Sequence, residues 1–127
     1  MNVLFVCVGN SGRSVMAERL FREAAAGRHE ARSRGAFPQT DAAEPVVVEA
    51  LAEVGIDASD HVPRKLGDDD LEWADVVVQV CDVGCPVVPG ARMESWGISD
   101  PWGLPLEGVR PIRDGIEQRV DGLLATL

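Results

Sequence analysis

The stretch NVLFVCVGNSGRSVMAERLF, residues 2–21, decides the fold, because a buried strand gives way to a helix within it. Its first part, residues 2–8, is a continuous apolar and β-branched run, which is typical of a strand buried on both faces. A turn rich in glycine, asparagine and serine follows. From residue 14 the apolar residues recur at helical spacing, with charged residues between them, and the helix is expected to end near Gly27.

The remaining chain continues this alternation of strands and helices. Strands are expected at 29–35, 74–81 and 91–98, and helices at 43–55, 68–73 and 110–127. Strands that alternate with helices form a mostly parallel sheet. The sequence therefore predicts an α/β fold with helices on both faces of the sheet, in a single three-layer catalytic domain over residues 1–127.

Composition and charge narrow the classes of partner. The chain has 127 residues and a net charge of −9, which argues against nucleic acid and anionic membrane surfaces as partners. Every apolar run is far shorter than the ~20 residues that span a bilayer. The N-terminal segment lacks the basic region and cleavage site of a signal peptide, so a cytoplasmic location is expected.

The chain contains three cysteines, Cys7, Cys81 and Cys85. An odd number of cysteines without a secretion signal is a poor framework for structural disulfides. In a reducing compartment such thiols are either buried core residues or reactive groups.

The turn after the first strand has the composition of an anion-binding loop. Backbone N–H groups of a glycine-rich turn and of a helix N-terminus can converge on one anion. The guanidinium of Arg13 is a planar fork that fits two oxygens of a tetrahedral oxyanion. Gly9 and Gly12 are expected to adopt backbone angles that a Cβ would resist, and Asn10 to tolerate the left-handed region. The expected oxyanion-binding residues are Val8, Gly9, Asn10, Ser11, Gly12 and Arg13.

Cys7 is the candidate nucleophile at the base of this loop. Loop dipoles and a nearby guanidinium favour the reactive thiolate over the thiol. Ser14 is placed to donate a hydrogen bond to the sulfur and to help it depart as a leaving group. The alternative is a strand that ends on a buried cysteine beside a solvated arginine. Neither a Walker A loop nor Gly-x-Gly-x-x-Gly fits, because the lysine of the first and the third glycine of the second are missing.

The segment VCVGNSGRS, residues 6–14, resembles the active-site loop of the low-molecular-weight protein tyrosine phosphatase superfamily, which includes thiol-linked arsenate reductases. VVVEALAEVGID, ADVVVQVC, CPVVPG, SDP and the last helix extend the resemblance over nearly the whole chain. The resemblance implies a four-stranded parallel sheet and makes Asp100 the general acid. Many family loops carry a second cysteine where this chain has Gly12, so chemistry that needs that cysteine is absent.

The same thiolate can begin two reactions, and Cys81 and Cys85 bear on the choice. In arsenate reduction a second thiol must attack Cys7, and the stretch from Cys81 to Pro101 looks like the arsenate-reductase branch. In the alternative, a phosphatase, water clears a phosphocysteine intermediate, and Trp102 after Asp-Pro favours this reaction. A third possibility is an oxyanion-binding module without turnover. Such a module needs neither a nucleophile nor an acid, so the candidate nucleophile and acid named above argue against it.

The predicted function is therefore a thiol-dependent arsenate reductase that acts on arsenate or phosphate oxyanions. Its expected electron donor is thioredoxin or a low-molecular-weight thiol such as mycothiol. We expect no bound cofactor and no metal site. Some similar thioredoxin-coupled reductases bind potassium with a carboxylate that aligns with Arg64 here, so no such ion is expected. His29 and His61 are expected to be solvated, and Asp68 to Asp70 to be helix caps and solvated surface.

Overall fold

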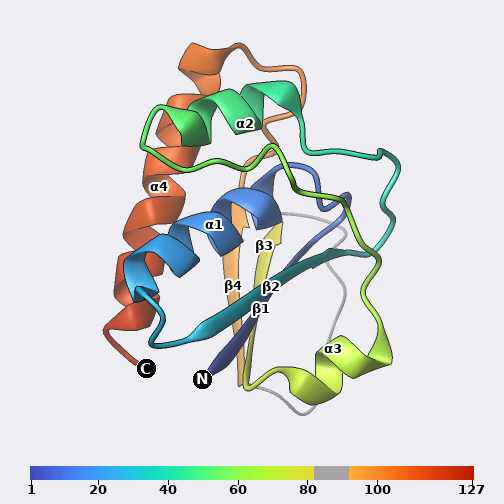
Figure 1. The fold of residues 1–127 in the computed structure, drawn as a ribbon, viewed down its shortest axis with the longest axis vertical. Helices are drawn as coiled ribbons and strands as arrows, with labels where there is room; N and C mark the ends of the chain where they lie inside the picture. Colours follow the sequence, from blue (N-terminus) through green and yellow to red (C-terminus); the bar gives the residue numbers. More distant parts are fainter. Residues whose placement is uncertain (82–91) are drawn as a thin grey trace.

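The computed structural model describes residues 1–81 and 92–127. Strands and helices alternate along most of it, and Figure 1 shows the sheet with helices packed beside it. The elements are β1 (Asn2–Cys7), α1 (Arg13–Ala25), β2 (Glu30–Gly35), α2 (Pro45–Ala52), α3 (Asp68–Trp73), β3 (Val76–Cys81), β4 (Arg92–Ile98) and α4 (Leu106–Leu124).

The sheet has four strands in the order β2-β1-β3-β4, and every neighbouring pair is parallel. The predicted four-stranded parallel sheet is therefore confirmed. Val6 of β1 is level with Arg34 of β2 and with Gln79 of β3. Because β1 and β3 are adjacent and parallel, Cys7 and Cys81 end neighbouring strands at the same edge of the sheet.

The larger core lies between the sheet and helices α1, α2 and α4. Phe5 of β1 is fully buried there and contacts Phe21 edge-on, with ring centroids 5.5 Å apart. A smaller cluster on the opposite face joins Leu4, Val6 and Val77 to residues of and around α3. Alternate residues of β1 thus face two apolar layers, which explains why the sequence of this strand is continuously apolar.

Two details differ from the sequence-based expectation. The last helix begins at Leu106 rather than near residue 110, so Pro111 lies inside it. Proline removes one backbone hydrogen bond, but Val109 and Ile116 on either side of it are fully buried, and this packing maintains the helix. Asp70 is not solvated: it is 2% exposed and ion-paired with Arg32 and Arg34 of β2, at 3.2 and 3.0 Å.

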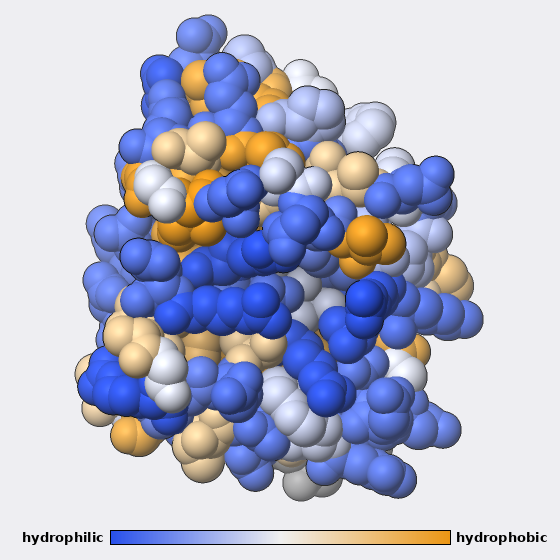
Figure 2. Space-filling model, in the orientation of Figure 1, coloured by the Kyte–Doolittle hydropathy of each residue, from blue (hydrophilic) through white to orange (hydrophobic). Residues whose placement is uncertain are grey.

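The surface seen in the orientation of Figure 1 is mostly hydrophilic, with small hydrophobic areas among the polar residues (Figure 2). None of the described helices is both long and apolar enough to cross a membrane. The large hydrophobic side chains that are exposed in the described residues include Phe37 and Trp102, whose positions matter below.

Candidate active site

The residues between β1 and α1 form one wall of a cavity at the carboxyl edge of the sheet. We call residues 7–13 the anion loop. The cavity has a volume of about 310 Å³ and is lined by all seven of these residues. Cys7 is only 3% exposed, yet its side chain belongs to this lining. The sulfur therefore lies at the base of a small open site, as the sequence predicts.

Three contacts define the surroundings of the Cys7 sulfur. The Ser14 hydroxyl lies 2.9 Å from Cys7 Sγ, and the backbone N–H of Asn10 donates to Sγ over 3.2 Å. The Asn10 side-chain amide donates to Ser14 Oγ over 2.8 Å. Because Ser14 Oγ accepts that bond, its own proton is available to point at the sulfur. Both donors to Sγ stabilise negative charge on it, which is what a nucleophilic thiolate needs.

Asn10 holds the conformation of the anion loop from its centre. Its φ of 54° lies in the left-handed region, as expected, and the residue is fully buried. Its side-chain oxygen accepts a hydrogen bond from the Arg64 backbone N–H at 2.9 Å. Its carbonyl lies 2.8 Å from His61 Nε2, which therefore carries the proton.

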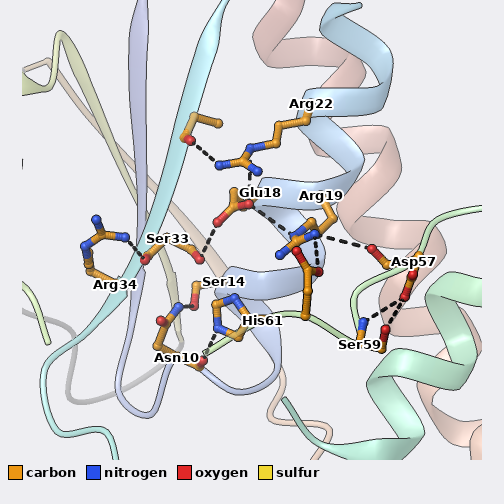
Figure 3. A network of polar contacts seen from close by, with 12 residues as sticks. Asn10, Ser14, Glu18, Arg19, Arg22, Ser33, Arg34, Asp57, Ser59 and His61 are labelled. Carbon is orange, nitrogen blue, oxygen red and sulfur yellow. Dashed lines mark hydrogen bonds and ion pairs between the residues drawn. The ribbon is translucent and has the colours of Figure 1, made fainter. Parts of the chain in front are cut away.

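His61 supports the loop from outside and is not solvated, so the expectation for this residue is wrong. It is 8% exposed, and burial lowers the pKa of its imidazole below the ordinary value of 6.5. Figure 3 shows His61 next to Asn10 and Ser14, at the edge of a polar network that continues through α1. The sequence around His61 is an ordinary polar connection, and we find no local signal in it that marks this role.

The glycines of the anion loop do not serve the purpose that the sequence suggests. Gly12 has a φ of −137°, and Gly9 also lies outside the left-handed region. A Cβ at Gly12 would lie 2.6 Å from Glu44 Oε2 and 3.1 Å from Pro101 Cγ. At Gly9 the nearest atom to such a Cβ would be Ser11 Oγ at 3.5 Å, an ordinary contact. A side chain at position 12 would thus require the Glu44 carboxyl to move, because Glu44 occupies the volume that the side chain would need.

Arg13 connects the anion loop to the segment that follows β4. Its Nη1 donates to the carbonyl of Ile98 at 3.1 Å, and its Nη2 lies 3.7 Å from Asp100 Oδ2. Asp100 is 57% exposed and accepts a hydrogen bond from the Trp102 backbone N–H at 3.0 Å. Arg13 and Asp100 both line the cavity, so the predicted anion ligand and the predicted acid share one site.

Glu44 is a site residue that sequence reasoning missed. It precedes α2, lines the cavity, and its backbone N–H donates to the Ser11 carbonyl at 2.9 Å. Burial raises the pKa of its carboxyl, the negative charge of Asp100 adds to the effect, and Arg13 opposes it. A glutamate before a helix proline is unremarkable in a sequence, so only its proximity to Gly12 shows its relevance.

A buried carboxylate lies behind the anion loop. Glu18 of α1 is 4% exposed and accepts a hydrogen bond from Ser33 of β2 at 2.7 Å. Its other oxygen lies 3.3 Å from Arg19 Nε and 3.2 Å from Arg22 Nε (Figure 3). The contact with Ser33 joins α1 to β2, whereas the two arginines belong to α1 itself.

In the described part of the chain, no three His, Cys, Asp or Glu side chains are grouped closely enough to hold a metal ion.

The remaining predicted residues divide into those near the cavity and those that cannot be placed there. Trp102 and Phe37 are 68% and 67% exposed and line the cavity as two aromatic side chains. Cys81 is 3% exposed at the end of β3. Cys85 lies outside the described residues, so of the predicted pair of redox cysteines the structure describes only Cys81, which is disulfide-bonded.

Comparison with known proteins agrees with this site. The family model for low molecular weight phosphotyrosine protein phosphatases matches residues 2–127. Arsenate reductase 1 of Staphylococcus haemolyticus is 36% identical, covering 98% of this chain and 96% of the relative. A structure described as an arsenate reductase in the phosphate binding state is 32% identical, with a TM-score of 0.89 over 98% of this chain and 97% of that one. The low molecular weight protein tyrosine phosphatase from T. tengcongensis is also 32% identical, with a TM-score of 0.88 over 100% of this chain and 99% of that one. The chain therefore belongs to the low molecular weight phosphotyrosine protein phosphatase family.

Proposed function

We propose that this protein is an arsenate reductase that converts arsenate to arsenite. The observation that carries the proposal is the free thiol of Cys7 at the base of the anion loop, with Ser14 and the Asn10 N–H directed at its sulfur. The anion loop holds the tetrahedral oxyanion, and Arg13 binds two of its oxygens. The similarity to named arsenate reductases over nearly the full chain supports this activity over others of the family.

The first step forms a bond between sulfur and arsenic. The Cys7 thiolate attacks arsenate, and one arsenate oxygen leaves as water after it receives protons. Asp100 is the proposed donor of a proton, since it lines the cavity beside Arg13. Ser14 stabilises the thiolate before the attack and again when the sulfur is displaced.

The second step transfers two electrons to arsenic. A second thiolate attacks Cys7 Sγ, the sulfur–sulfur bond forms, and the sulfur–arsenic bond breaks. The electron pair of that bond stays on arsenic, which leaves as arsenite, while the two sulfurs are oxidised to a disulfide. In their reduced form, Cys81 and Cys85 are the proposed internal thiols, and the position of Cys81 on the strand next to β1 supports this role.

An external thiol must then reduce the disulfide that remains. Thioredoxin or a low-molecular-weight thiol such as mycothiol would supply the two electrons. A thiol-dependent cycle of this kind suits the reducing cytoplasm, where we place the protein.

A phosphatase activity is the second candidate, and a specific observation favours it. Phe37 and Trp102 line the cavity and are mostly exposed, so they can contact the ring of an aryl phosphate. In this reaction Cys7 takes the phosphoryl group, Asp100 protonates the leaving oxygen, and water hydrolyses the phosphocysteine. This reaction needs neither Cys81 nor Cys85.

One comparison of activities tests the proposal. Arsenite release from arsenate is measured with thioredoxin, with mycothiol and without reductant, beside the hydrolysis of an aryl phosphate. We expect Cys7→Ser to abolish both activities, and Cys81→Ser and Cys85→Ser to abolish arsenite release while aryl phosphate hydrolysis continues. Rapid hydrolysis by the wild type without arsenite release under any reductant would leave the phosphatase as the function.

A further inference from the structure

Glu44 places a second carboxyl in the anion site, and neither proposed reaction uses it. The side chain is 8% exposed and lines the same cavity as Cys7, Arg13 and Asp100. Its Oε2 lies where a side chain at position 12 would extend, against the backbone of the anion loop. The hydrogen bond from the Glu44 N–H to the Ser11 carbonyl, 2.9 Å long, ties the residue to that loop. Glu44 therefore lines the cavity in which an oxyanion is proposed to bind, next to the anion loop.

The charges around Glu44 make an ionised carboxylate costly once an anion is present. Within the described residues, the titratable groups that line the cavity with Glu44 are Arg13 from α1, Asp100 from the segment after β4, and Cys7 at the end of β1. Arg13 is the basic group among them, whereas Asp100, Glu44 and Cys7 are acidic groups that a bound anion would join. An oxyanion can therefore bind beside Glu44 at low cost only if a proton lies between them.

We propose that Glu44 is a specificity-determining residue that shares one proton with the bound oxyanion. Arsenate and phosphate bring such a proton with them near neutral pH, because one of their oxygens is still protonated. Sulfate and the dianion of a phosphate monoester carry none, so they bind only after Glu44 itself takes a proton from water. The site thus prefers free arsenate or phosphate over sulfate and over ionised monoesters, and the preference grows as the pH rises.

The proposal rests on the proposed function only in requiring a tetrahedral anion in the anion loop. Because burial and Asp100 raise the pKa of Glu44, its proton is held more firmly than in an exposed glutamate. The same residue gives a reason for Gly12: a larger side chain at that position would displace the Glu44 carboxyl from the anion. Preference for free oxyanions over monoesters would also favour arsenate reduction over phosphatase activity in one and the same site.

Binding measurements with inorganic anions test the proposal without turnover. The dissociation constants of phosphate and sulfate are measured by calorimetry from about pH 5 to about pH 8 for the wild type, Glu44→Gln and Glu49→Gln. Glu49 is exposed on α2, so its variant matches the change in charge without altering the cavity. Above the pKa of Glu44, wild-type sulfate affinity should fall by about tenfold per pH unit relative to Glu44→Gln, because one proton is taken up. Glu49→Gln should follow the wild type.

The outcomes separate this proposal from the function. Equal sulfate profiles for the wild type and Glu44→Gln, with phosphate still bound, would overturn the role of Glu44 and leave the anion site standing. Failure of the wild type to bind either anion would overturn the anion site and both proposed reactions with it. If Glu44→Gln does not fold, carbon-13 NMR of the wild-type glutamate carboxyls gives the answer. The Glu44 resonance should titrate at a higher pH with saturating sulfate, and an unchanged titration would reject the proposal.

Discussion

The Ser14 hydroxyl lies 2.9 Å from the Cys7 sulfur and accepts a hydrogen bond from the Asn10 amide at 2.8 Å. This arrangement directs the hydroxyl proton at the sulfur, so Ser14 acts on the charge of the nucleophile without touching the substrate. A hydrogen bond to a charged group contributes about 2 kcal/mol, which corresponds to roughly thirtyfold in rate. Loss of this contact should therefore be measurable as a change in the reaction rate.

Replacement of Ser14 by alanine should reduce kcat for arsenate reduction about thirtyfold, because this hydrogen bond is lost. The rate at which iodoacetate alkylates Cys7 at neutral pH should fall as well, because the sulfur loses the Ser14 hydrogen bond that stabilises negative charge on it. The control is Ser59→Ala, which removes an exposed hydroxyl that is bonded to Asp57 and does not line the cavity. An unchanged alkylation rate in Ser14→Ala would show that the hydroxyl does not act on the sulfur.

Gly12→Ala tests the crowding between the anion loop and Glu44. The new Cβ would lie 2.6 Å from Glu44 Oε2 and 3.1 Å from Pro101 Cγ, so we expect a loss of about 1–3 kcal/mol in unfolding free energy. Phosphate binding should weaken as the loop shifts. Gly9→Ala serves as the control, because its Cβ would meet Ser11 Oγ at an ordinary 3.5 Å.

A second-site change distinguishes the cause of the Gly12→Ala defect. Combining it with Glu44→Ala removes the atom that the new methyl group meets, and the double variant should recover part of the lost stability. The coupling between the two changes should be about 0.5–3 kcal/mol in a double-mutant cycle. Additive effects would place the defect elsewhere, for example at Pro101.

His61 gives the stability of the protein a specific dependence on pH. Burial lowers the pKa of His61 in the folded protein, whereas the unfolded chain titrates near 6.5. Below that value the unfolded chain binds the additional proton first, so stability falls as the pH decreases from 6.5 toward the lower folded value. His61→Gln, which retains a donor for the Asn10 carbonyl, should lose this part of the dependence in urea titrations. His29→Gln should retain it, since His29 lies far from the anion loop at the N-terminus.

The ion pairs of Glu53 should give the stability of the protein a second dependence on pH, at lower pH. Glu53 follows α2, and its two arginine partners lie on α4. Hydrogen bonds from Arg110 of α4, followed by that from Arg113, lower the pKa of Glu53 to about 2. The distances to Arg110 Nη2 and Arg113 Nη1 are 2.6 and 2.8 Å. The stabilisation is complete above about pH 4.5 and is lost as the pH falls toward 2.

Acid unfolding curves measure the contribution of Glu53. The urea concentration at the midpoint of unfolding is measured at each pH. Between about pH 4.5 and about pH 2, this midpoint should change less for Glu53→Gln than for the wild type. Glu49→Gln removes an exposed carboxylate from α2, the helix that ends just before Glu53, and should leave the wild-type curve in place. Parallel curves for all three proteins would contradict the assigned ion pairs.

The parts of this structure that sequence reasoning predicts are those that depend on local pattern. The apolar run of β1 indicates a strand buried on both faces, and the change of period after it places Cys7 and Arg13 at one junction. Long-range contacts explain what was missed. His61 meets Asn10 across 51 positions, and Glu44 meets Gly12 through a turn whose path no local pattern specifies. Pro111 lies inside a helix because packing on both sides outweighs one missing hydrogen bond.

The ion pair between Arg13 and Asp100, 3.7 Å long, implies that substrate and acid compete for the same guanidinium. An anion that binds the same nitrogen of Arg13 separates the guanidinium from the Asp100 carboxyl, which the Trp102 backbone N–H still holds. Substrate binding therefore changes the partners of the acid, so anion affinity and the position of Asp100 are coupled through a single side chain.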